Sequence, residues 1–537
     1  MTPIFQLCDE YVFKAAQLDP VDAVYNGIKG DFGVATDYSP DGHAAREALI
    51  RDTLSRLAAL DPTCEADRQA AAHLRERLEA MAAWHETGEP YRDLSAPFGL
   101  VSGVRDSIDL LPHGDDEQWR KVAAHLAAVP GMLAGWRRSL EEGLRRGLPA
   151  ARRQALGAAE QAERYVGTHD DLVASYGDGP VAGELAEAAG AAHAGYAEIA
   201  RYLREEYAPR AAERDAVGPE RYAVAARLSL GDDIDLREAY AWGWAELDRI
   251  QAEMEREAEA VLPGATVDEA IAHLDETQVV TGPDAFHAWL KEQHERAIEE
   301  LDGVVFDIPE PLRKIDVVLN PGSTSGAPYY TPPSEDLSRP GRTWWPLGGR
   351  ERFTVWNELT TVFHEGVPGH HLQLGAAVVA GEKLSRYSRL SFVSGHGEGW
   401  ALYAERLADE LGWFTAPGTR LGMLAASALR AARVVIDIGV HLELPLPDGS
   451  AWTFEKACEV LRHRGRGEPH VIEPEVLRYF GWPAQAISYK LGERAWLEAR
   501  AEASAKPGFD LKRWHTAALA LGPIGLGGLR EALARLS

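Results

Sequence analysis

Residues 354–373, TVWNELTTVFHEGVPGHHLQ, constrain the fold of this chain more than any other stretch. Apolar side chains such as Leu359, Val362 and Phe363 recur at three- and four-residue spacing, which predicts a helix with one buried face and Thr354 as its N-cap. A His-Glu pair follows late in this helix, and two more histidines come after a Val-Pro-Gly insert. Because proline removes a backbone donor and disrupts a helix, Pro368 predicts a bend or bulge in a helix over 354–380.

The spacing of the histidines decides which of them can share a metal ion. In the H-E-x-x-H motif, two histidines at i and i+4 hold zinc on one helical face, and the glutamate beside the first acts as general base. Here the second histidine is His370 at i+6 or His371 at i+7 from His364. In an unbroken helix His370 would point about 120° away, whereas His371 would return to the same face about 10 Å along the axis. A two-residue bulge would move His370 to the usual i+4 place, so we favour His364 and His370 as ligands and keep His371 as the alternative. Glu365 is the candidate general base.

A second segment, SGHGEGWALYAE at 394–405, offers carboxylates for the same site. Glu398 stands at the start of an amphipathic pattern and is flanked by glycines, which allow close backbone approach. Glu405 follows seven residues later on the same helical side and could accept a hydrogen bond from a ligand histidine. Neutral imidazole and carboxylate together suit zinc. We therefore predict a Zn2+ site with Glu398 as third ligand.

Composition excludes several other classes of function. The chain has 537 residues, of which 45% are apolar and 26% charged, as in ordinary globular proteins. Lys+Arg of 56 against Asp+Glu of 83 gives 56 − 83 = −27, which argues against nucleic acid or an anionic membrane as partner. The stretch 421–444 is apolar but carries Arg430, Arg433 and Asp437, which disfavours a membrane span.

Three cysteines, far apart in the sequence, argue against a disulfide framework or a cysteine zinc site. The N-terminal residues show no basic leader followed by an apolar run. From these features we expect a soluble cytoplasmic protein.

The remaining pattern predicts a mainly α fold. Residues 1–215 show one short amphipathic helix after another, with a turn expected at Pro130-Gly131, and form an N-terminal helical region. Residues 216–537 form a helical region that carries both motifs. Within it, 315–319 (IDVVL) is the best strand, and 320–347, rich in Gly, Pro and Ser, predicts loops with one or two edge strands at the rim of a cleft. Later helices are expected over 397–411, 421–444, 453–462, 473–499 and 510–536.

The two motifs resemble those of the bacterial domain-of-unknown-function 885 family, which is grouped with gluzincin-like zinc peptidases. The matching residues are HEGVPGHHLQ and EGWALYAE, with YYTPP at 329–333, RVVIDIGVH at 433–441, EVLRY at 475–479 and PAQAISYK at 483–490. The family's Pro-Gly-Gln-Ala is Pro-Ala-Gln-Ala here. EGWALYAE also resembles the third-ligand helix of thimet oligopeptidase-like and carboxypeptidase Taq-like enzymes, in which a glycine precedes the second ligand histidine, as Gly369 precedes His370.

The resemblance implies a large, helical, two-lobed metallopeptidase-like fold with a deep cleft and a few short edge strands. It also implies His370 as second ligand and Glu398 as third. Two extra residues between the histidines separate this chain from those enzymes.

Other polar residues are candidates for supporting roles. Tyr489 and Tyr479, with His441 behind them, could donate to a tetrahedral oxyanion. Arg478 or Arg433 could grip a substrate carboxylate, although an ordinary ion pair within a helix is an alternative for each. Tyr330, in the aromatic pair of the predicted rim, is a candidate substrate contact.

The leading hypothesis is a zinc-dependent hydrolase that cleaves short peptides, with a carboxypeptidase as one form of it. A metal-dependent amidase acting on a small non-peptide amide is the alternative within enzymes. A metal-binding protein that uses its cleft for recognition without catalysis is the alternative outside them.

Overall fold

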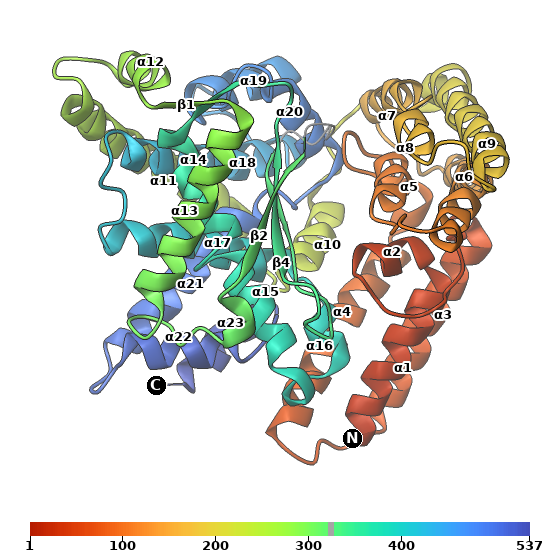
Figure 1. The fold of residues 1–537 in the computed structure, drawn as a ribbon, viewed down its shortest axis with the longest axis horizontal. Helices are drawn as coiled ribbons and strands as arrows, with labels where there is room; N and C mark the ends of the chain where they lie inside the picture. The colour runs from red at the N-terminus through yellow and green to blue at the C-terminus, as the bar shows by residue number, and fades with distance from the viewer. Residues whose placement is uncertain (321–326, 537) are drawn as a thin grey trace. The chain divides into compact units, whose positions relative to one another are not determined.

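Helices make up most of this protein (Figure 1). The structure, a computed structural model, describes residues 1–320 and 327–536. Five short strands accompany the helices in this part of the chain, so the predicted mainly α class is confirmed. The chain divides into two compact units: Met1–Val224 with Pro474–Pro483, and Ala225–Glu473 with Ala484–Ser537.

The first unit is built from helices around one apolar core, which includes Trp119, Leu126 and Trp136. Its helices are α1 (Pro3–Leu18), α2 (Pro20–Tyr25), α3 (Pro40–Ala58), α4 (Glu65–Glu86), α5 (Leu100–Asp109), α6 (Asp116–Arg145), α7 (Arg152–Arg164), α8 (Asp170–Ser175) and α9 (Ala182–Arg201). The turn predicted at Pro130-Gly131 is wrong, because α6 continues through Pro130 for 30 residues. Gly195 of α9 lies against Pro130, and this packing between α6 and α9 overrides the local preference of proline.

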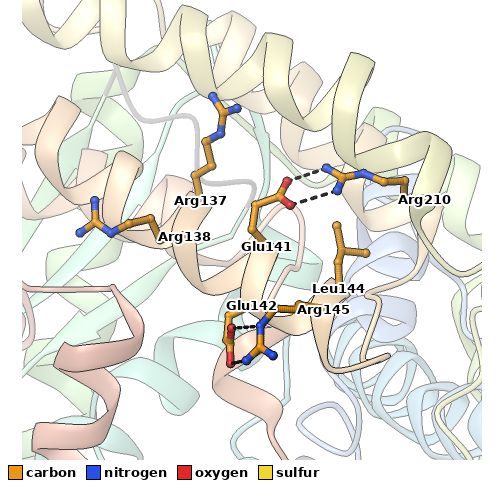
Figure 2. A pocket seen from close by; sticks show the side chains of 7 residues that line it. All are labelled: Arg137, Arg138, Glu141, Glu142, Leu144, Arg145 and Arg210. Carbon is orange, nitrogen blue, oxygen red and sulfur yellow. Dashed lines mark hydrogen bonds and ion pairs between the residues drawn. The ribbon is translucent and has the colours of Figure 1, made fainter.

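A pocket of about 690 Å³ opens on this unit beside α6 (Figure 2). Arg210 pairs with Glu141, and Arg145 with Glu142, so glutamates offset much of the arginine charge there. Exposed pairs of this kind contribute little to stability.

The second unit holds both sequence motifs. Its helices are α11 (Leu236–Val261), α12 (Val267–Thr277), α13 (Pro283–Leu301), α14 (Val355–Glu365), α15 (His370–Val379), α16 (Arg386–Leu390), α17 (Ser394–Glu410), α18 (Thr419–His441), α19 (Phe454–His463), α21 (Ser488–Ser504), α22 (Leu511–Leu519) and α23 (Leu526–Ala534). Two further helices, α10 (Pro219–Leu230) and α20 (Ile472–Gly481), contain two of the three points at which the chain passes from one unit to the other, and the third lies between Pro483 and Ala484.

Three of the predicted helices are each divided in two. The helix expected over 354–380 is α14 and α15, that over 473–499 is α20 and α21, and that over 510–536 is α22 and α23. Pro368, Pro483 and Pro523 lie in the three breaks, where each removes a backbone donor. Thr354 is the N-cap of α14, but its hydroxyl donates to Asn357 Oδ1 and caps no backbone amide.

The strands form two small sheets. Strands β1 (Val279–Thr281) and β5 (Arg352–Thr354) pair antiparallel, and β2 (Ile315–Asn320), β4 (Gly341–Pro346) and β3 (Tyr329–Thr331) lie in that order in the other sheet. The strand predicted at 315–319 is confirmed as β2. The edge-strand prediction for 320–347 is wrong for β4, which is central and pairs parallel to β2 and antiparallel to β3. Residues 321–326 of that predicted loop lie outside the described part.

Close helix packing positions α17. A Cβ on Gly399 of α17 would lie 2.4 Å from Gly492 of α21, so only paired glycines allow this crossing. α14 packs on α18 through a similar approach, because Gly422 faces the carbonyl of Trp356. Among the helices that the structure describes, none is long and apolar enough to cross a bilayer.

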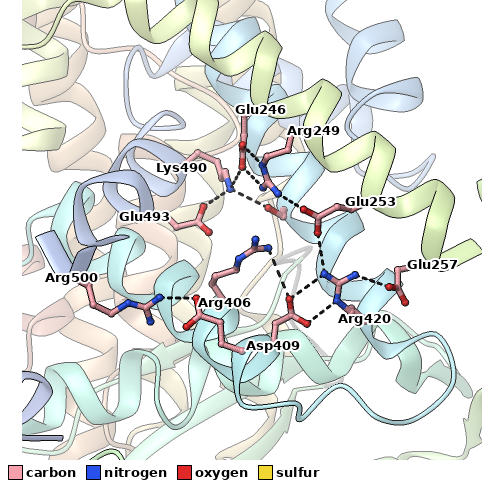
Figure 3. Close-up of polar contacts among 12 residues, drawn as sticks. Glu246, Arg249, Glu253, Glu257, Arg406, Asp409, Arg420, Lys490, Glu493 and Arg500 are labelled. Carbon is pink, nitrogen blue, oxygen red and sulfur yellow. Dashed lines mark hydrogen bonds and ion pairs between the residues drawn. The ribbon is translucent and has the colours of Figure 1, made fainter. Parts of the chain in front are cut away.

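An ion-pair network joins four helices of this unit (Figure 3). Buried Lys490 of α21 contacts Glu493 and, at 3.0 Å, Glu246 of α11. The network continues through Glu253 of α11 to Arg420 of α18, which also binds Asp409 of α17. Buried charges cost free energy unless they are paired, so this network stabilises the unit only while it stays complete.

We expect Lys490→Met to lower the free energy of unfolding by about 3 kcal/mol at pH 7, because Glu493 and Glu246 lose their buried cation. Burial alone would raise the pKa of Glu246, but Arg249 and Lys490 outweigh it and hold the pKa at about 2, below the usual 4.5. A lowered pKa adds stability above about pH 4.5 that is lost as the pH falls towards 2. The deficit of the variant should therefore shrink in urea unfolding at pH 3.

Lys512→Met is the matched control, because Lys512 pairs with exposed Asp307 and is itself about one-third exposed. It should change stability by less than about 1 kcal/mol. An equal loss in both variants, or a deficit of Lys490→Met that is independent of pH, would contradict the account.

Candidate metal centre

A four-residue break between α14 and α15 sets the histidine geometry. α14 ends at Glu365 and α15 begins at His370. The Gly369 amide donates to the carbonyl of Phe363 at 3.0 Å, and the indole of Trp400 donates to the carbonyl of Pro368 at 2.8 Å. A Cβ on Gly369 would lie 2.0 Å from the carbonyl oxygen of His364, so the break requires glycine there. His370 thus starts a new helix, and the predicted bulge within one helix is replaced by this break.

The break brings His364, His370 and Glu398 together. His364 Nε2 and His370 Nε2 lie 3.5 Å and 3.6 Å from Glu398 Oε2, and one donor atom from each residue lies within 4.8 Å of the other two. The centroids of the two imidazole rings are 4.9 Å apart, and the rings are nearly perpendicular. Zinc bonds of about 2.0–2.2 Å in a tetrahedral arrangement separate ligand atoms by roughly 3.3–3.6 Å. These three residues therefore fit a zinc ion.

Glu405 orients His364. Its Oε1 lies 2.7 Å from His364 Nδ1, and its Oε2 accepts from the hydroxyl of Thr360. Because a carboxylate accepts, Nδ1 carries the proton and the Nε2 lone pair is left for a metal. His370 has no such support: its Nδ1 is buried and has no hydrogen-bond partner in the described part of the chain.

The charges in this site favour a cation. Burial alone would lower the pKa of His364, but Glu398 and Glu405 outweigh it and raise the pKa to about 9. Burial would raise the pKa of Glu398, yet the two histidines hold it well below its usual range. The pKa of Glu365 is raised, chiefly because this side chain is buried. Three carboxylates thus converge on two imidazoles, an excess of negative charge that a divalent ion offsets.

His371 lies in a different environment from His370. Its Nε2 is 2.9 Å from the carbonyl of Leu312, and its Nδ1 is 3.0 Å from the hydroxyl of Tyr330. Both ring nitrogens are therefore engaged, and neither is left for a metal. The hydroxyl of Tyr330 is engaged in this same contact with His371. A contact between Tyr330 and substrate stays a prediction.

Of the predicted oxyanion donors, Tyr489 lies beside the centre. Its ring stacks on that of His364 with 6.5 Å between centroids, and the guanidinium of Arg433 lies 4.6 Å above the Tyr489 ring. His441 is fully buried on α18, with Nε2 3.7 Å from the carboxylate of Asp437. Catalytic roles for these residues remain predictions.

Tyr479 and Arg478 belong to the first unit. The Tyr479 hydroxyl donates to Glu475 at 2.5 Å, and Arg478 binds the same carboxylate through Nε and Nη2 at 3.1 and 3.0 Å. Arg478 thus forms an ion pair within its own helix, which was the alternative to a role in substrate binding. The role of Tyr479 as an oxyanion donor and the contact of Arg478 with a substrate carboxylate stay predictions.

Two contributors were missed by sequence reasoning. Thr360 holds Glu405, and its position one helical turn before His364 was a usable signal. Trp400 anchors the break through Pro368, but nothing in the local pattern distinguishes its indole from an ordinary core side chain.

Comparison with known proteins places the chain in a family. The pattern described as "Bacterial protein of unknown function (DUF885)" matches residues 20–533. The chain belongs to the DUF885 family. No curated protein sequence matches it significantly.

Two solved structures share the fold of this DUF885 protein. A protein described as a "putative lipoprotein" from Colwellia psychrerythraea has a TM-score of 0.86 and 19% identity, with 99% of this chain and 98% of that one covered. A second, described as "a putative lipoprotein of unknown function" from Shewanella oneidensis, has a TM-score of 0.77 and 18% identity, with 99% of each chain covered. At these identities the likeness concerns the fold alone.

Substituting each neighbouring histidine separates the two candidate ligands. We expect His370→Ala to lose zinc on dialysis, because two ligands remain. His371→Ala should retain zinc but lose stability, because the Leu312 carbonyl and the Tyr330 hydroxyl lose their partner. Elemental analysis and urea unfolding measure the two effects. Zinc loss in His371→Ala but not in His370→Ala would reverse the assignment.

Glu405→Gln should weaken zinc binding by about 10- to 100-fold, because the amide no longer fixes the His364 ring and its proton as a carboxylate does. Competition with a chromogenic chelator measures the affinity. Glu410→Gln, on the last turn of the same helix, makes the same charge change at an exposed carboxylate that pairs with Arg500, and it should leave the affinity unchanged. Equal losses in both variants would show a general charge effect instead.

Proposed function

We propose that this DUF885 protein is a zinc-dependent hydrolase, and specifically a peptidase acting on short peptides. The observation that carries the proposal is the convergence of two imidazole nitrogens and one carboxylate oxygen within 4.8 Å, beside a further buried glutamate. Two histidines with one glutamate form the donor set of many catalytic zinc sites, in which a fourth position remains open. The similarity of the two motifs to gluzincin-like peptidases supports the same assignment.

Zinc bound here would polarise a substrate carbonyl and lower the pKa of a water molecule. Glu365 would take a proton from water and pass it to the leaving amine. Its carboxylate is buried and makes no hydrogen bond or ion pair with any residue that the structure describes. A buried carboxylate without a protein partner is suited to accept from water and substrate.

Stabilisation of the oxyanion is assigned to Tyr489. Its ring lies against that of His364, and the guanidinium of Arg433 lies 4.6 Å from the centroid of the same ring. A cation close to a phenol favours the transfer of partial negative charge onto it, which strengthens the hydroxyl as a donor.

We expect Glu365→Gln to lower the rate of peptide cleavage by about 100-fold or more while zinc content stays unchanged, because the amide cannot accept a proton. A mixed peptide library with products identified by mass spectrometry measures the activity, and elemental analysis measures the zinc. Glu382→Gln, which makes the same change at an exposed turn, is the control and should cleave as wild type does.

The outcomes separate the three hypotheses. Cleavage that persists unchanged in Glu365→Gln would refute this mechanism. Turnover of small amides without cleavage of any peptide would favour the amidase. Tight zinc binding with no product from either class would favour a recognition protein.

A further inference from the structure

A small pocket lies beside the candidate centre, between α15, α16 and the first turn of α17. Phe392 lines it, and the ring of Phe392 lies 6.3 Å from that of His370. Gly397 lines it as well and directly precedes Glu398. The pocket and the candidate metal centre therefore lie next to each other.

Three buried polar atoms of pocket residues have no hydrogen-bond partner among the residues that the structure describes: His396 Nε2, Gln373 Oε1 and Arg389 Nε. His396 and Gln373 are only 4% and 5% exposed. Gln373 Nε2 donates to the carbonyl of His396 at 3.4 Å and lies 2.9 Å from His396 Nδ1. Nδ1 must therefore accept, and Nε2 carries the hydrogen. The pocket offers two N–H donors and one carbonyl acceptor that the described chain leaves unused.

The pocket is also electropositive. Arg389 lies 3.7 Å from the carboxylate of Glu335, but Arg386 already binds that carboxylate through two nitrogens at 3.0 and 3.2 Å. One carboxylate thus serves two guanidiniums, which leaves a net positive charge. α17 begins here without a side-chain cap, and the free amides at the start of a helix attract anions.

The size of the pocket limits its ligand. The space open to the centre of a water molecule is about 20 Å³, which leaves room for a small polar group at the end of a ligand and excludes an aromatic ring. A carboxylate accepts from both N–H groups, and an amide N–H next to it donates to Gln373 Oε1.

We propose that this pocket binds a carboxylate of the substrate, held by Arg389 and His396. The carboxylate belongs to the C-terminus of the peptide or to an acidic side chain. Carboxylate binding itself needs neither zinc nor turnover. The identification of the bound carboxylate as part of a substrate rests on the proposed function.

The first test measures binding without catalysis. Full-length protein is treated with a chelator, so that a carboxylate cannot bind the metal, and is titrated with N-acetyl-L-alanine and N-acetyl-L-alaninamide by ligand-observed NMR. We expect the acid to bind at least about 10-fold more tightly than the amide. Equal affinities, or no binding of the acid at millimolar concentrations, would overturn the proposal.

Two variants act on the pocket by different physical means. Arg389→Gln removes the charge and should weaken binding of the acid by about 10- to 100-fold. Ala377→Val fills space at a buried lining position and should weaken both ligands. Circular dichroism verifies that each variant is folded. Undiminished binding of the acid in folded Arg389→Gln would overturn the proposal.

Arg296→Gln on α13 is the matched control. Arg296 is exposed, pairs with Glu300 and lies outside the pocket lining. The substitution makes the same charge change and should leave the affinity for the acid unchanged. An equal loss of affinity for the acid in this variant would show that net charge causes the effect, and it would overturn the proposal that the pocket binds the carboxylate.

Cleavage assays then identify the source of the carboxylate. If it is the C-terminus, amidated peptides should show a raised KM on wild type and no further rise on Arg389→Gln. If it is a side chain, the same pattern should follow replacement of Asp or Glu by Asn or Gln. Cleavage that neither change affects would refute the binding of a substrate carboxylate in this pocket, but it would not contradict the proposed hydrolase function. Acid binding that depends on Arg389, without any cleavage, would refute the hydrolase and leave the pocket standing.

Discussion

The glycine-bounded break at residues 366–369 is the constraint on which the candidate site depends. Within one straight helix, His364 and His370 would point about 120° apart. The break lets the second helix start in a new direction, which places the two imidazoles 4.9 Å apart. The close approach of Gly369 to the carbonyl of His364 and the bond from Trp400 to Pro368 hold that geometry. The ligand arrangement is thus encoded in backbone packing as much as in the histidines themselves.

Placing this much charge inside a protein needs compensation. Glu405 is satisfied by His364, Thr360 and, at 3.9 Å, Arg430. Glu398 faces two imidazoles at distances slightly too long for good hydrogen bonds. Glu365 has no such partner in the described chain. Isolated buried carboxylates are costly, so the arrangement is at its most stable with a cation between the ligands.

Features of the fold that depend on local sequence pattern could be predicted from the sequence. Helical periodicity gave the fold class, and the position of Pro368 indicated the interruption between the histidines. The choice between His370 and His371 was less accessible, because the partners of His371 lie 59 and 41 residues away at Leu312 and Tyr330. Spacing along a chain carries no information about such contacts. The central place of β4 was missed for the same reason, since strand order is a tertiary property.

Helices α15 and α17 each contribute residues to both the candidate centre and the carboxylate pocket. Near the start of α17, His396 lines the pocket and Glu398 lies with the histidines of the centre. On α15, Gln373 follows His370 by three residues, close to one helical turn, and binds His396 across the helix pair. Any shift of α15 against α17 would therefore change metal geometry and pocket geometry together. Trp400 ties α17 to the break before α15. Together with the contact between Gln373 and His396, it fixes the distance between the pocket and the candidate centre.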